Sequence, residues 1–279
     1  MAKLAGLYRP TTLPEALSLL AQDPDAKPIS GGATLVAMMN ARVLEPEALV
    51  SLAAIEDLRG ITVLPDGTMR IGALTRHCET AADPRLGDSL YVVRDAASQI
   101  ANAVVRNMGT IGGSIAFADP GLDYPPALVA ADAQVELASA QGTRRLAIED
   151  FFVDWYVTAL EPGEIVSAVL LPKPQPGVSR YHKLARVSGD YAIASVAIAR
   201  VASGAIRVAI GACGPTPIHS DEADRLLSAD TSSAGIARAA EILVGLADPV
   251  DDVRASAAYR RTVIPRLLER AVRETEQPR

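Results

Sequence analysis

The stretch of sequence on which the fold depends is residues 106–116, RNMGTIGGSIA. Its centre, Gly112-Gly113, has a hydroxyl side chain on each side, Thr110 and Ser114, and it follows a segment of mostly helical periodicity, residues 86–105. Glycine lets the main chain come close to a bound group, and the amides of such a turn can bind an anion. The stretch therefore predicts a glycine-rich turn that could hold the phosphates of a ligand.

A second diglycine occurs earlier in the chain, within the sequence Ser30-Gly31-Gly32-Ala33-Thr34-Leu35. It follows a short strand-like segment (27–30) and precedes a helix-compatible one (34–41). Together the two turns could bind one dinucleotide. Neither turn matches GxGxxG or GxxxxGK[ST], so a Rossmann or P-loop fold is disfavoured. Each turn taken alone is more often an ordinary tight turn.

The periodicity around these turns predicts a mixed α and β protein with a boundary at the proline-rich segment 172–177. Before that boundary we expect helices at 13–20, 86–105 and 124–130, strands at 48–52 and 134–138, and a hairpin of 61–64 with 68–71. After it we expect strands at 191–201 and 205–212 and helices at 233–246 and 256–272. The C-terminal part is then a short antiparallel sheet covered by helices.

Composition limits the classes of partner. The 279 residues are 49% hydrophobic, enough for two lobes and an appended domain, and the formal net charge is -6. No run of basic residues is longer than a pair such as Arg144-Arg145, so we expect neither nucleic acid nor an anionic membrane as a partner. No apolar run approaches the roughly 20 residues of a transmembrane helix, and no signal-peptide core precedes residue 6. We therefore expect a cytoplasmic protein.

Residues that could perform chemistry are sparse. The two cysteines, Cys78 and Cys213, form no CxxC motif, so metal centres that serve this protein belong on another chain. The three histidines have no second ligand at metal-binding spacing, so we interpret His77, His182 and His219 as structural. No catalytic triad or carboxylate pair is apparent, which favours a cofactor carrier without catalytic or metal-binding residues of its own. Asp119 and Asp123 precede a helix, where each could cap it or hydrogen-bond a cofactor.

Several strings in this sequence, in the same order, resemble the flavin-binding medium subunits of molybdenum hydroxylases. Residues 106–116 are similar to the family string RNxGTIGGxIA. Other similar strings are Ile71-Gly72-Ala73-Leu74-Thr75, Ala118-Asp119-Pro120, Phe151-Phe152, Thr158-Ala159-Leu160, Tyr181-His182-Lys183, Asp190-Tyr191-Ala192 and Ala258-Tyr259-Arg260-Arg261. The resemblance covers nearly the whole chain. The family comprises the medium subunits of carbon-monoxide dehydrogenase and its relatives, and the corresponding segment of xanthine dehydrogenase.

The resemblance implies an α+β protein with the vanillyl-alcohol-oxidase-type FAD-binding fold, in which two α/β subdomains hold the cofactor between them. A small C-terminal α+β domain, an antiparallel sheet with helices, follows. For this chain the implied boundaries are 1–172 for the FAD-binding domain, with subdomains of approximately 1–55 and 56–172, and 177–279 for the C-terminal domain.

The resemblance also implies which residues bind FAD. The first turn would contribute Ile29, Ser30, Gly31, Gly32, Ala33, Thr34, Leu35 and Val36, and the second Thr110, Ile111, Gly112, Gly113 and Ser114. Asp123 would hydrogen-bond the ribityl or diphosphate region, and Ile100 would pack near the flavin. Ile165, Lys183 and Tyr191 would contact the cofactor from the far side, with Tyr191 over the isoalloxazine. Many relatives carry Asp or Ser followed by Thr or Gln where this chain has Ala33-Thr34, so a side-chain contact is expected to be missing there.

The implied function is electron transfer within a heteromeric complex. A large molybdopterin-binding subunit would oxidise the substrate, a small [2Fe–2S] subunit would pass the electrons to the FAD on this chain, and NAD, a quinone or oxygen would accept them. Two alternatives remain open. One is a free-standing flavin oxidoreductase with its own substrate, although the sequence has no evident acid–base cluster for it. The other is an assembly or scaffold subunit that has lost the cofactor, against which the intact glycines argue.

Overall fold

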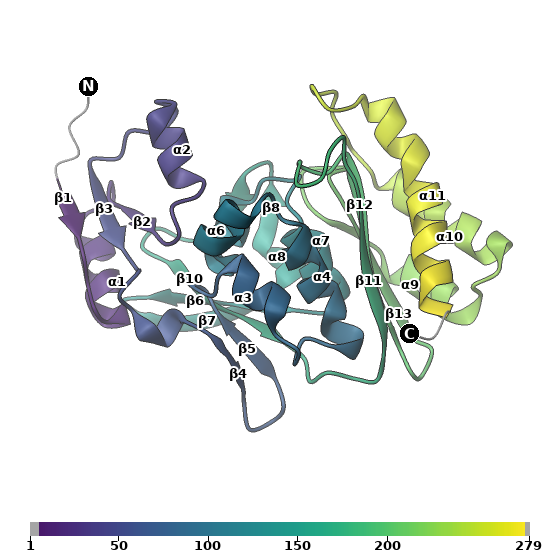
Figure 1. Ribbon diagram of the computed structural model, residues 1–279, viewed down its shortest axis with the longest axis horizontal. Coiled ribbons are helices and arrows are strands. Elements are labelled where there is room, and N and C mark those ends of the chain that lie inside the picture. The colour runs from purple at the N-terminus through teal and green to yellow at the C-terminus, as the bar shows by residue number, and fades with distance from the viewer. Residues whose placement is uncertain (1–5, 277–279) are drawn as a thin grey trace.

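The described residues form four sheets, and the three larger ones succeed one another along the long axis of the molecule, each with its own helices (Figure 1). The computed structural model describes residues 6–276. The architecture is α+β, as expected from the sequence. None of the described helices is both long and apolar enough to cross a membrane.

The N-terminal sheet is small and parallel, in the order β1 (Gly6–Tyr8), β3 (Ala48–Ser51), β2 (Lys27–Ile29). Helix α1 (Leu13–Gln22) begins with Thr12 as N-cap and buries one apolar face on this sheet. Helix α2 (Leu35–Asn40) follows the first glycine turn and buries none of its side chains. It lies above the N-terminal sheet in the view of Figure 1, apart from the strands.

The central sheet is antiparallel. Its order is β4 (Ile61–Val63), β5 (Met69–Gly72), β10 (Ile165–Leu171), β6 (Gln134–Ser139), β7 (Gly142–Ala147). Every residue of β10 is buried, as expected for a central strand covered on both faces. The helices beside this sheet are α3 (His77–Ala82), α4 (Tyr91–Gln99), α5 (Ala103–Met108), α6 (Ile111–Phe117) and α7 (Tyr124–Ala130). The remaining short elements are the 3-10 helices η1 (Glu56–Leu58) and η2 (Asp88–Leu90), helix α8 (Ile148–Phe151), and the strands β8 (Phe152–Asp154) and β9 (Val157–Thr158).

The C-terminal sheet is also antiparallel, in the order β11 (Gly177–Leu184), β12 (Ala194–Val201), β13 (Ile206–Gly211), β14 (Ile218–His219). Alternate residues point to opposite faces. Tyr181, Ala197 and Ala209 pack into the central core, toward α4 and α7, whereas Val196 and Ile210 pack toward the C-terminal helices. Those helices are α9 (Asp221–Ala229), α10 (Ser233–Gly245) and α11 (Ala257–Glu276).

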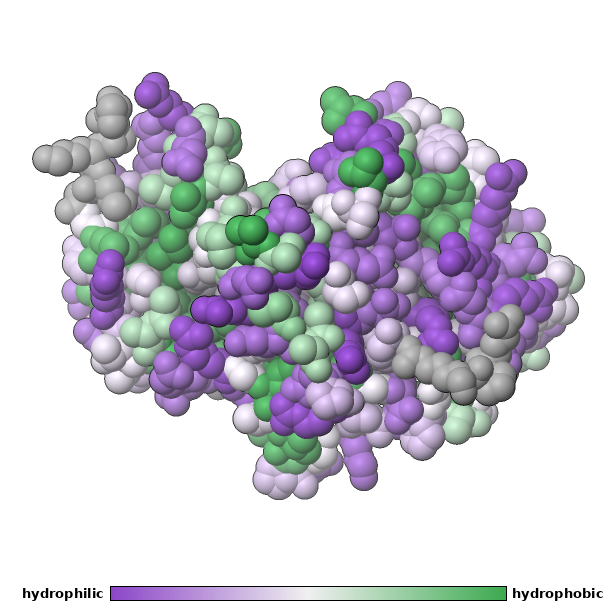
Figure 2. Space-filling model, in the orientation of Figure 1, coloured by the Kyte–Doolittle hydropathy of each residue, from purple (hydrophilic) through white to green (hydrophobic). Residues whose placement is uncertain are grey.

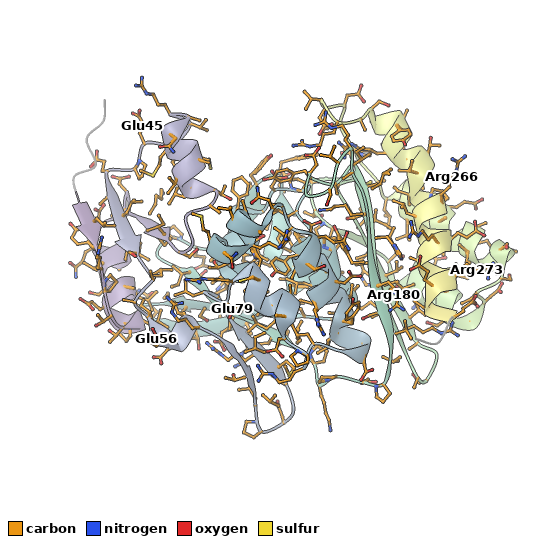
Figure 3. All side chains as sticks on the ribbon, viewed as in Figure 1. Glu45, Glu56, Glu79, Arg180, Arg266 and Arg273 are labelled. Carbon is orange, nitrogen blue, oxygen red and sulfur yellow. The ribbon has the colours of Figure 1, made fainter. Side chains whose placement is uncertain are left out.

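Charged side chains lie on the outer elements at both ends of the molecule. Glu45, Glu56 and Glu79 are on the side of the N-terminal and central sheets, and Arg180, Arg266 and Arg273 are on β11 and α11 (Figure 3).

Most expected elements are confirmed, including helix α1, the β4–β5 hairpin and helices α10 and α11. The prediction of one continuous helix over 86–105 was wrong. Helix α4 ends at Gln99, Ala101 takes a positive φ of 41°, and Asn102 caps a new helix, α5. The prediction of a glycine-rich turn at Gly112-Gly113 was also wrong, since both residues are helical and lie at the start of α6. Sequence periodicity missed β7, β11 and α9.

Candidate cofactor site

A cavity of about 1070 Å³ lies where the N-terminal sheet, α6 and the loop at 189–191 meet. The surface is hollowed between the side of α2 and the loops of the C-terminal sheet (Figure 2). Its volume is just above the usual range for small-molecule and cofactor sites, about 300–1,000 Å³. The residues that line the cavity come from distant parts of the sequence, from Leu20 in α1 to Tyr191 before β12.

The two glycine motifs, 80 residues apart, contact each other at this cavity. The Thr110 hydroxyl donates to Ser30 Oγ at 3.1 Å. A Cβ atom at Gly31 would overlap the carbonyl oxygen of Met108, and one at Gly113 would lie 2.7 Å from Ser30 Oγ. Glycine is therefore required at Gly31 for the main chains of the two motifs to approach this closely.

Free main-chain donors come mostly from the first motif. The amides of Gly32, Ala33, Thr34 and Leu35 donate no hydrogen bond within residues 6–276. Gly32 has a φ of +75°, a conformation that glycine adopts at no steric cost. Consecutive unpaired amides in such a loop form a concave site for an anion. This segment has the geometry expected of a diphosphate-binding loop.

The second motif has a different structural role from the one its sequence suggested. The amides of Ile111 and Gly112 donate to the carbonyls of Thr75 and Ala73, at 3.0 and 2.9 Å. The Gly113 amide donates to the Thr110 side chain at 3.2 Å, which caps α6. The sequence predicted that these three amides are free to bind a ligand. That prediction was wrong, because each amide already donates a hydrogen bond within the protein. The hydroxyl residues of the motif still line the cavity.

Asp123 presents a carboxylate at the cavity and does not cap α7. It occupies the N-cap position, but its side chain makes no capping hydrogen bond. Tyr181 donates to Asp123 Oδ1 at 2.7 Å, and Lys183 Nζ lies 2.9 Å from the same oxygen. Burial raises the pKa of Asp123, and the charge of Lys183 opposes that rise. The helix-cap alternative for Asp123 is therefore wrong.

His77 lines the cavity, although its sequence context indicated only a structural role. Its ring packs against Gly109, and its Nδ1 lies 3.3 Å from the hydroxyl of the buried Tyr124. Burial, helped by the charge of Arg106, lowers its pKa to about 4, so the imidazole is neutral at neutral pH. No periodicity could have found this residue, because the pairing of segment 73–77 with segment 109–112 places it here.

Two further groups of residues, around Ile165 and Tyr191, form walls of the cavity. At one, Ile165 lines the cavity beside Glu164, which accepts two hydrogen bonds of 2.7 Å from Arg144. At the other, Tyr191 lies 37% exposed, with the Arg254 guanidinium 4.9 Å from the centre of its ring. A cation at this distance is attracted to the ring face. Arg254 therefore stabilises the position of Tyr191 at the cavity mouth.

The structure gathers most of the expected site residues around one cavity. Those that line it are Ile29, Ser30, Gly31, Gly32, Ala33, Thr34, Leu35, Ile100, Thr110, Gly112, Gly113, Ser114, Asp123, Ile165 and Tyr191. Three do not. Val36 is 43% exposed on α2, Ile111 is fully buried in the core, and Lys183 contacts the site through Asp123. Segments 24–28, which includes the start of β2, and 160–164 also line the cavity, and the sequence did not predict them as part of the site.

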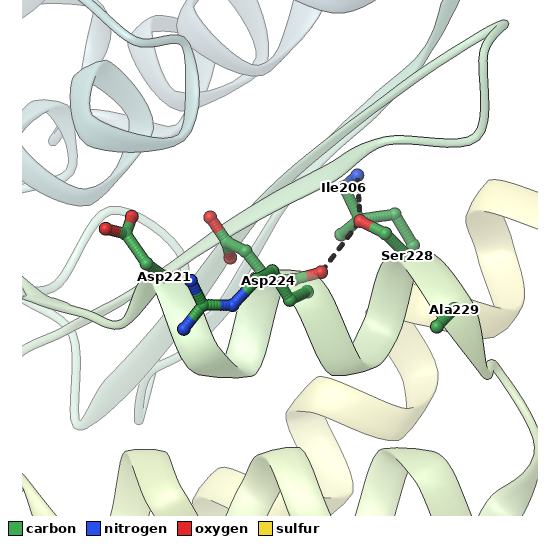
Figure 4. Close-up of a pocket in the computed structure, with 6 residues that line it drawn as sticks. Ile206, Asp221, Asp224, Ser228 and Ala229 are labelled. Carbon is green, nitrogen blue, oxygen red and sulfur yellow. Dashed lines mark hydrogen bonds between the residues drawn. The ribbon is translucent and has the colours of Figure 1, made fainter.

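A polar cluster outside the cavity also departs from expectation. Ligand atoms of His219, Asp221 and Asp224 lie within 4.8 Å of one another, so the expectation that His219 has no second ligand at metal-binding spacing was wrong. Its Nδ1 lies 2.9 Å from Glu149 Oε2 and its Nε2 2.9 Å from Asp224 Oδ2. Both ring nitrogens are thus occupied by ion pairs. Figure 4 shows Asp221 and Asp224 on α9, beside a second pocket of about 520 Å³.

The fold and the cavity define a class of protein with room for a dinucleotide, and unpaired amides and a carboxylate are among the groups of the residues that line the cavity. Comparison with known proteins specifies the family. Residues 3–174 match the FAD binding domain in molybdopterin dehydrogenase, and residues 179–275 match the CO dehydrogenase flavoprotein C-terminal domain. The chain belongs to this family of FAD-binding medium subunits of molybdenum hydroxylases. Its cofactor is FAD, and it is an oxidoreductase subunit.

Individual relatives match over almost the full length of the chain. The alpha subunit of the 6-hydroxypseudooxynicotine dehydrogenase complex of Paenarthrobacter nicotinovorans is 37% identical, over 92% of this chain and 89% of the relative. The carbon monoxide dehydrogenase medium chain of Afipia carboxidovorans is 35% identical, over 95% and 94%. A chain in the structure of cyanide-inactivated Cu,Mo-CO dehydrogenase superposes with a TM-score of 0.94 at 32% identity, covering 99% of both chains.

Proposed function

We propose that this chain is the electron-transfer subunit of a heteromeric molybdenum hydroxylase. In the proposed complex, a large molybdopterin-binding subunit oxidises the substrate and a small subunit with [2Fe–2S] clusters delivers the electrons to the FAD bound here. NAD, a quinone or oxygen then accepts them. The relatives named as medium chains or complex subunits support this placement.

The observation that carries the proposal is the contact of the two glycine motifs at one cavity. The unpaired amides of the first motif fit a diphosphate, whose charge they would stabilise. Ile100 and Tyr191, which lie elsewhere along the same cavity, offer apolar and aromatic surface suited to a flavin ring. The residues present thus fit the diphosphate and the flavin ring of FAD.

Bound FAD would accept electrons one at a time from iron–sulfur clusters and pass them on in pairs. The protein residues bind and orient it. The loop 31–35 would hold the diphosphate, and the ionised form of Asp123 would accept a hydrogen bond from the cofactor. No residue of this chain is required as a general acid or base in this proposal.

We also propose the division of the chain into an FAD-binding domain, 1–172, with subdomains at about 1–55 and 56–172, and a C-terminal domain, 177–279. The short segment 172–177 between β10 and β11 supports this boundary. The ends of the proposed domains, residues 1–5 and 277–279, lie outside the described residues.

Affinity purification of the tagged chain from its host tests the proposal. We expect a yellow preparation with about one FAD per chain and two co-purifying subunits, which together contain molybdenum and iron. A flavin-containing chain that travels alone and oxidises a small organic substrate would favour a free-standing oxidoreductase. A complex with no flavin absorbance would favour a scaffold subunit.

A further inference from the structure

Tyr181 contributes a buried hydroxyl next to the cavity that the proposed function does not use. The residue lies on β11 and is only 2% exposed, and its hydroxyl donates to Asp123 Oδ1 at 2.7 Å. Its main chain is fixed as well. The Tyr181 amide donates to Asp95 Oδ2 at 3.1 Å, and its carbonyl accepts from Gln99 Nε2 at 3.3 Å. Strand β11 is therefore held against α4 at this residue.

Lys183, two residues further on the same face of β11, contacts the same carboxylate oxygen. Its Nζ lies 2.9 Å from Asp123 Oδ1 and donates to the Gln99 carbonyl at 2.8 Å. Both donors meet Oδ1, and the other oxygen, Oδ2, accepts no hydrogen bond within residues 6–276. Asp123 lines the cavity, so its unpaired oxygen is available to a ligand there.

The charge of Asp123 depends on these two donors. Burial raises the pKa of Asp123, while the charge of Lys183 and the hydrogen bonds from Tyr181 and Lys183 lower it. Burial also raises the pKa of Tyr181 well above its ordinary value, so its hydroxyl remains protonated and continues to donate. The other titratable groups that interact with Asp123 are Tyr124, next to it in α7, and Tyr191 in the cavity loop.

We propose that Tyr181 is a positioning residue for FAD. Together with Lys183 it fixes Oδ1 of Asp123, so that Oδ2 faces the cavity as a charged acceptor for a hydroxyl or N–H group of the cofactor. A carboxylate repels phosphate, so this acceptor serves a part of FAD other than the diphosphate. The inference rests on the proposed function, in which FAD occupies this cavity.

Substitution Tyr181→Phe removes the hydroxyl and keeps the ring. The tagged full chain, with the subunits that accompany it, is stripped of FAD and titrated with FAD between about pH 5.5 and 8.5. We expect Tyr181→Phe to weaken FAD binding about tenfold near pH 6, the loss of one hydrogen bond to a charged group. We also expect the pH below which affinity falls to move upward, because the carboxylate has lost a donor.

Two comparisons separate positioning from structural damage. Ser179→Ala removes another fully buried hydroxyl of β11, which is bonded to the Asp88 carbonyl and the Val92 amide and not to Asp123, and should leave the pH profile of FAD binding unchanged. In an Asp123→Asn background, Tyr181→Phe should cause little further loss, because the two residues act through one contact.

The outcomes distinguish this inference from the proposed function. If the unsubstituted protein does not bind FAD, the proposed function fails and the inference with it. If the unsubstituted protein binds FAD and Tyr181→Phe has the same affinity and pH profile, the inference alone is overturned. Equal losses in Tyr181→Phe and Ser179→Ala, matched by equal drops in melting temperature, also overturn it.

Discussion

The two adjacent glycines in α6 have different neighbours and therefore different roles. A Cβ at Gly112 would lie 2.5 Å from Ala73 Cβ and 2.9 Å from the Ala73 carbonyl oxygen, so the main chain would have to move. A Cβ at Gly113 would meet the side-chain oxygens of Ser30 and Thr110, at 2.7 and 3.1 Å, and those side chains can rotate. Gly112 is thus required mainly for packing, and Gly113 for the contact between the two motifs.

We predict that Gly112→Ala destabilises the fold by about 1–3 kcal/mol through overpacking. Gly113→Ala should cost much less stability but weaken FAD binding, by roughly tenfold, because it disturbs the Ser30–Thr110 contact. Thermal unfolding without FAD and FAD titration of the same samples measure the two effects. The assignment is wrong if the two variants lose stability and affinity in the same proportion.

His77 makes the stability of the protein depend on pH. Its pKa of about 4 in the folded state lies below the ordinary value of 6.5, so the unfolded chain binds a proton first as the pH falls. Above pH 6.5 the titration of His77 costs no stability. As the pH falls from 6.5 to 4, it lowers the free energy of unfolding by about 3 kcal/mol in all.

The variant His77→Gln lacks this titration. We predict that the free energy of unfolding of the unsubstituted protein, relative to that of His77→Gln, falls by roughly 2 kcal/mol between about pH 7 and pH 5. Urea denaturation at the two pH values, without added FAD, gives the difference. A constant difference would show that folding does not shift the pKa of His77.

At the scale of elements, a polar cluster joins the C-terminal sheet to the central region. His219 of β14 bridges Glu149 of α8 and Asp224 of α9, and Arg207 of β13 donates to Glu149 at 3.2 Å and to the Val129 carbonyl at 2.7 Å. Burial by itself lowers the pKa of His219, but the hydrogen bond to Asp224 and the nearby carboxylates raise it above its ordinary value. The histidine is therefore more readily charged in the folded protein than in the unfolded chain.

Folding raises the pKa of His219, so protonated His219 stabilises the folded protein. This stabilisation is fully present below pH 6.5, the pKa in the unfolded chain, and is lost as the pH rises through the pKa in the folded protein. We predict that Asp224→Asn lowers the free energy of unfolding by about 2 kcal/mol near pH 6 and by less near pH 9. Guanidinium denaturation at both pH values measures this. Asp221→Asn is the control, because Asp221 is largely exposed and 3.8 Å from the ring nitrogen, so it should change stability little. A pH-independent loss in Asp224→Asn would contradict the assignment.

At the scale of the whole molecule, one hydrophobic core crosses the proline-rich linker. Tyr181, Ala197 and Ala209 belong to the same buried cluster as Leu128 of α7 and Val93 of α4. The C-terminal sheet thus covers helices that are themselves part of the central region. The cavity depends on this packing, since Asp123 is fixed by side chains of β11.

We predict that a chain ending at Pro174 does not fold cooperatively, because α4 and α7 lose their cover and a domain has only about 5–15 kcal/mol of net stability. Circular dichroism melting and size-exclusion chromatography of the truncated and full chains provide the test. A sharp, monomeric unfolding transition in the truncated chain would show that the central region is self-sufficient.

The sequence by itself determined the elements with strong local signals. Thr12 and the apolar spacing of Ala16, Leu17 and Leu20 specify α1, and the proline-rich segment marks the break before β11. The two glycine pairs indicated a dinucleotide site, because glycine adopts main-chain conformations that other residues avoid and lets a ligand approach the main chain closely. These are local properties, which neighbours in the sequence suffice to express.

Only the tertiary structure decided which groups at the site are free to bind. Whether an amide such as that of Gly112 is unpaired depends on a carbonyl from Ala73, far away in the chain. In the same way, β11 brings Tyr181 and Lys183 to Asp123, and strand pairing places His77 at the cavity. Hydrogen bonds and burial between distant segments arise from packing of the whole chain, and periodicity does not encode them.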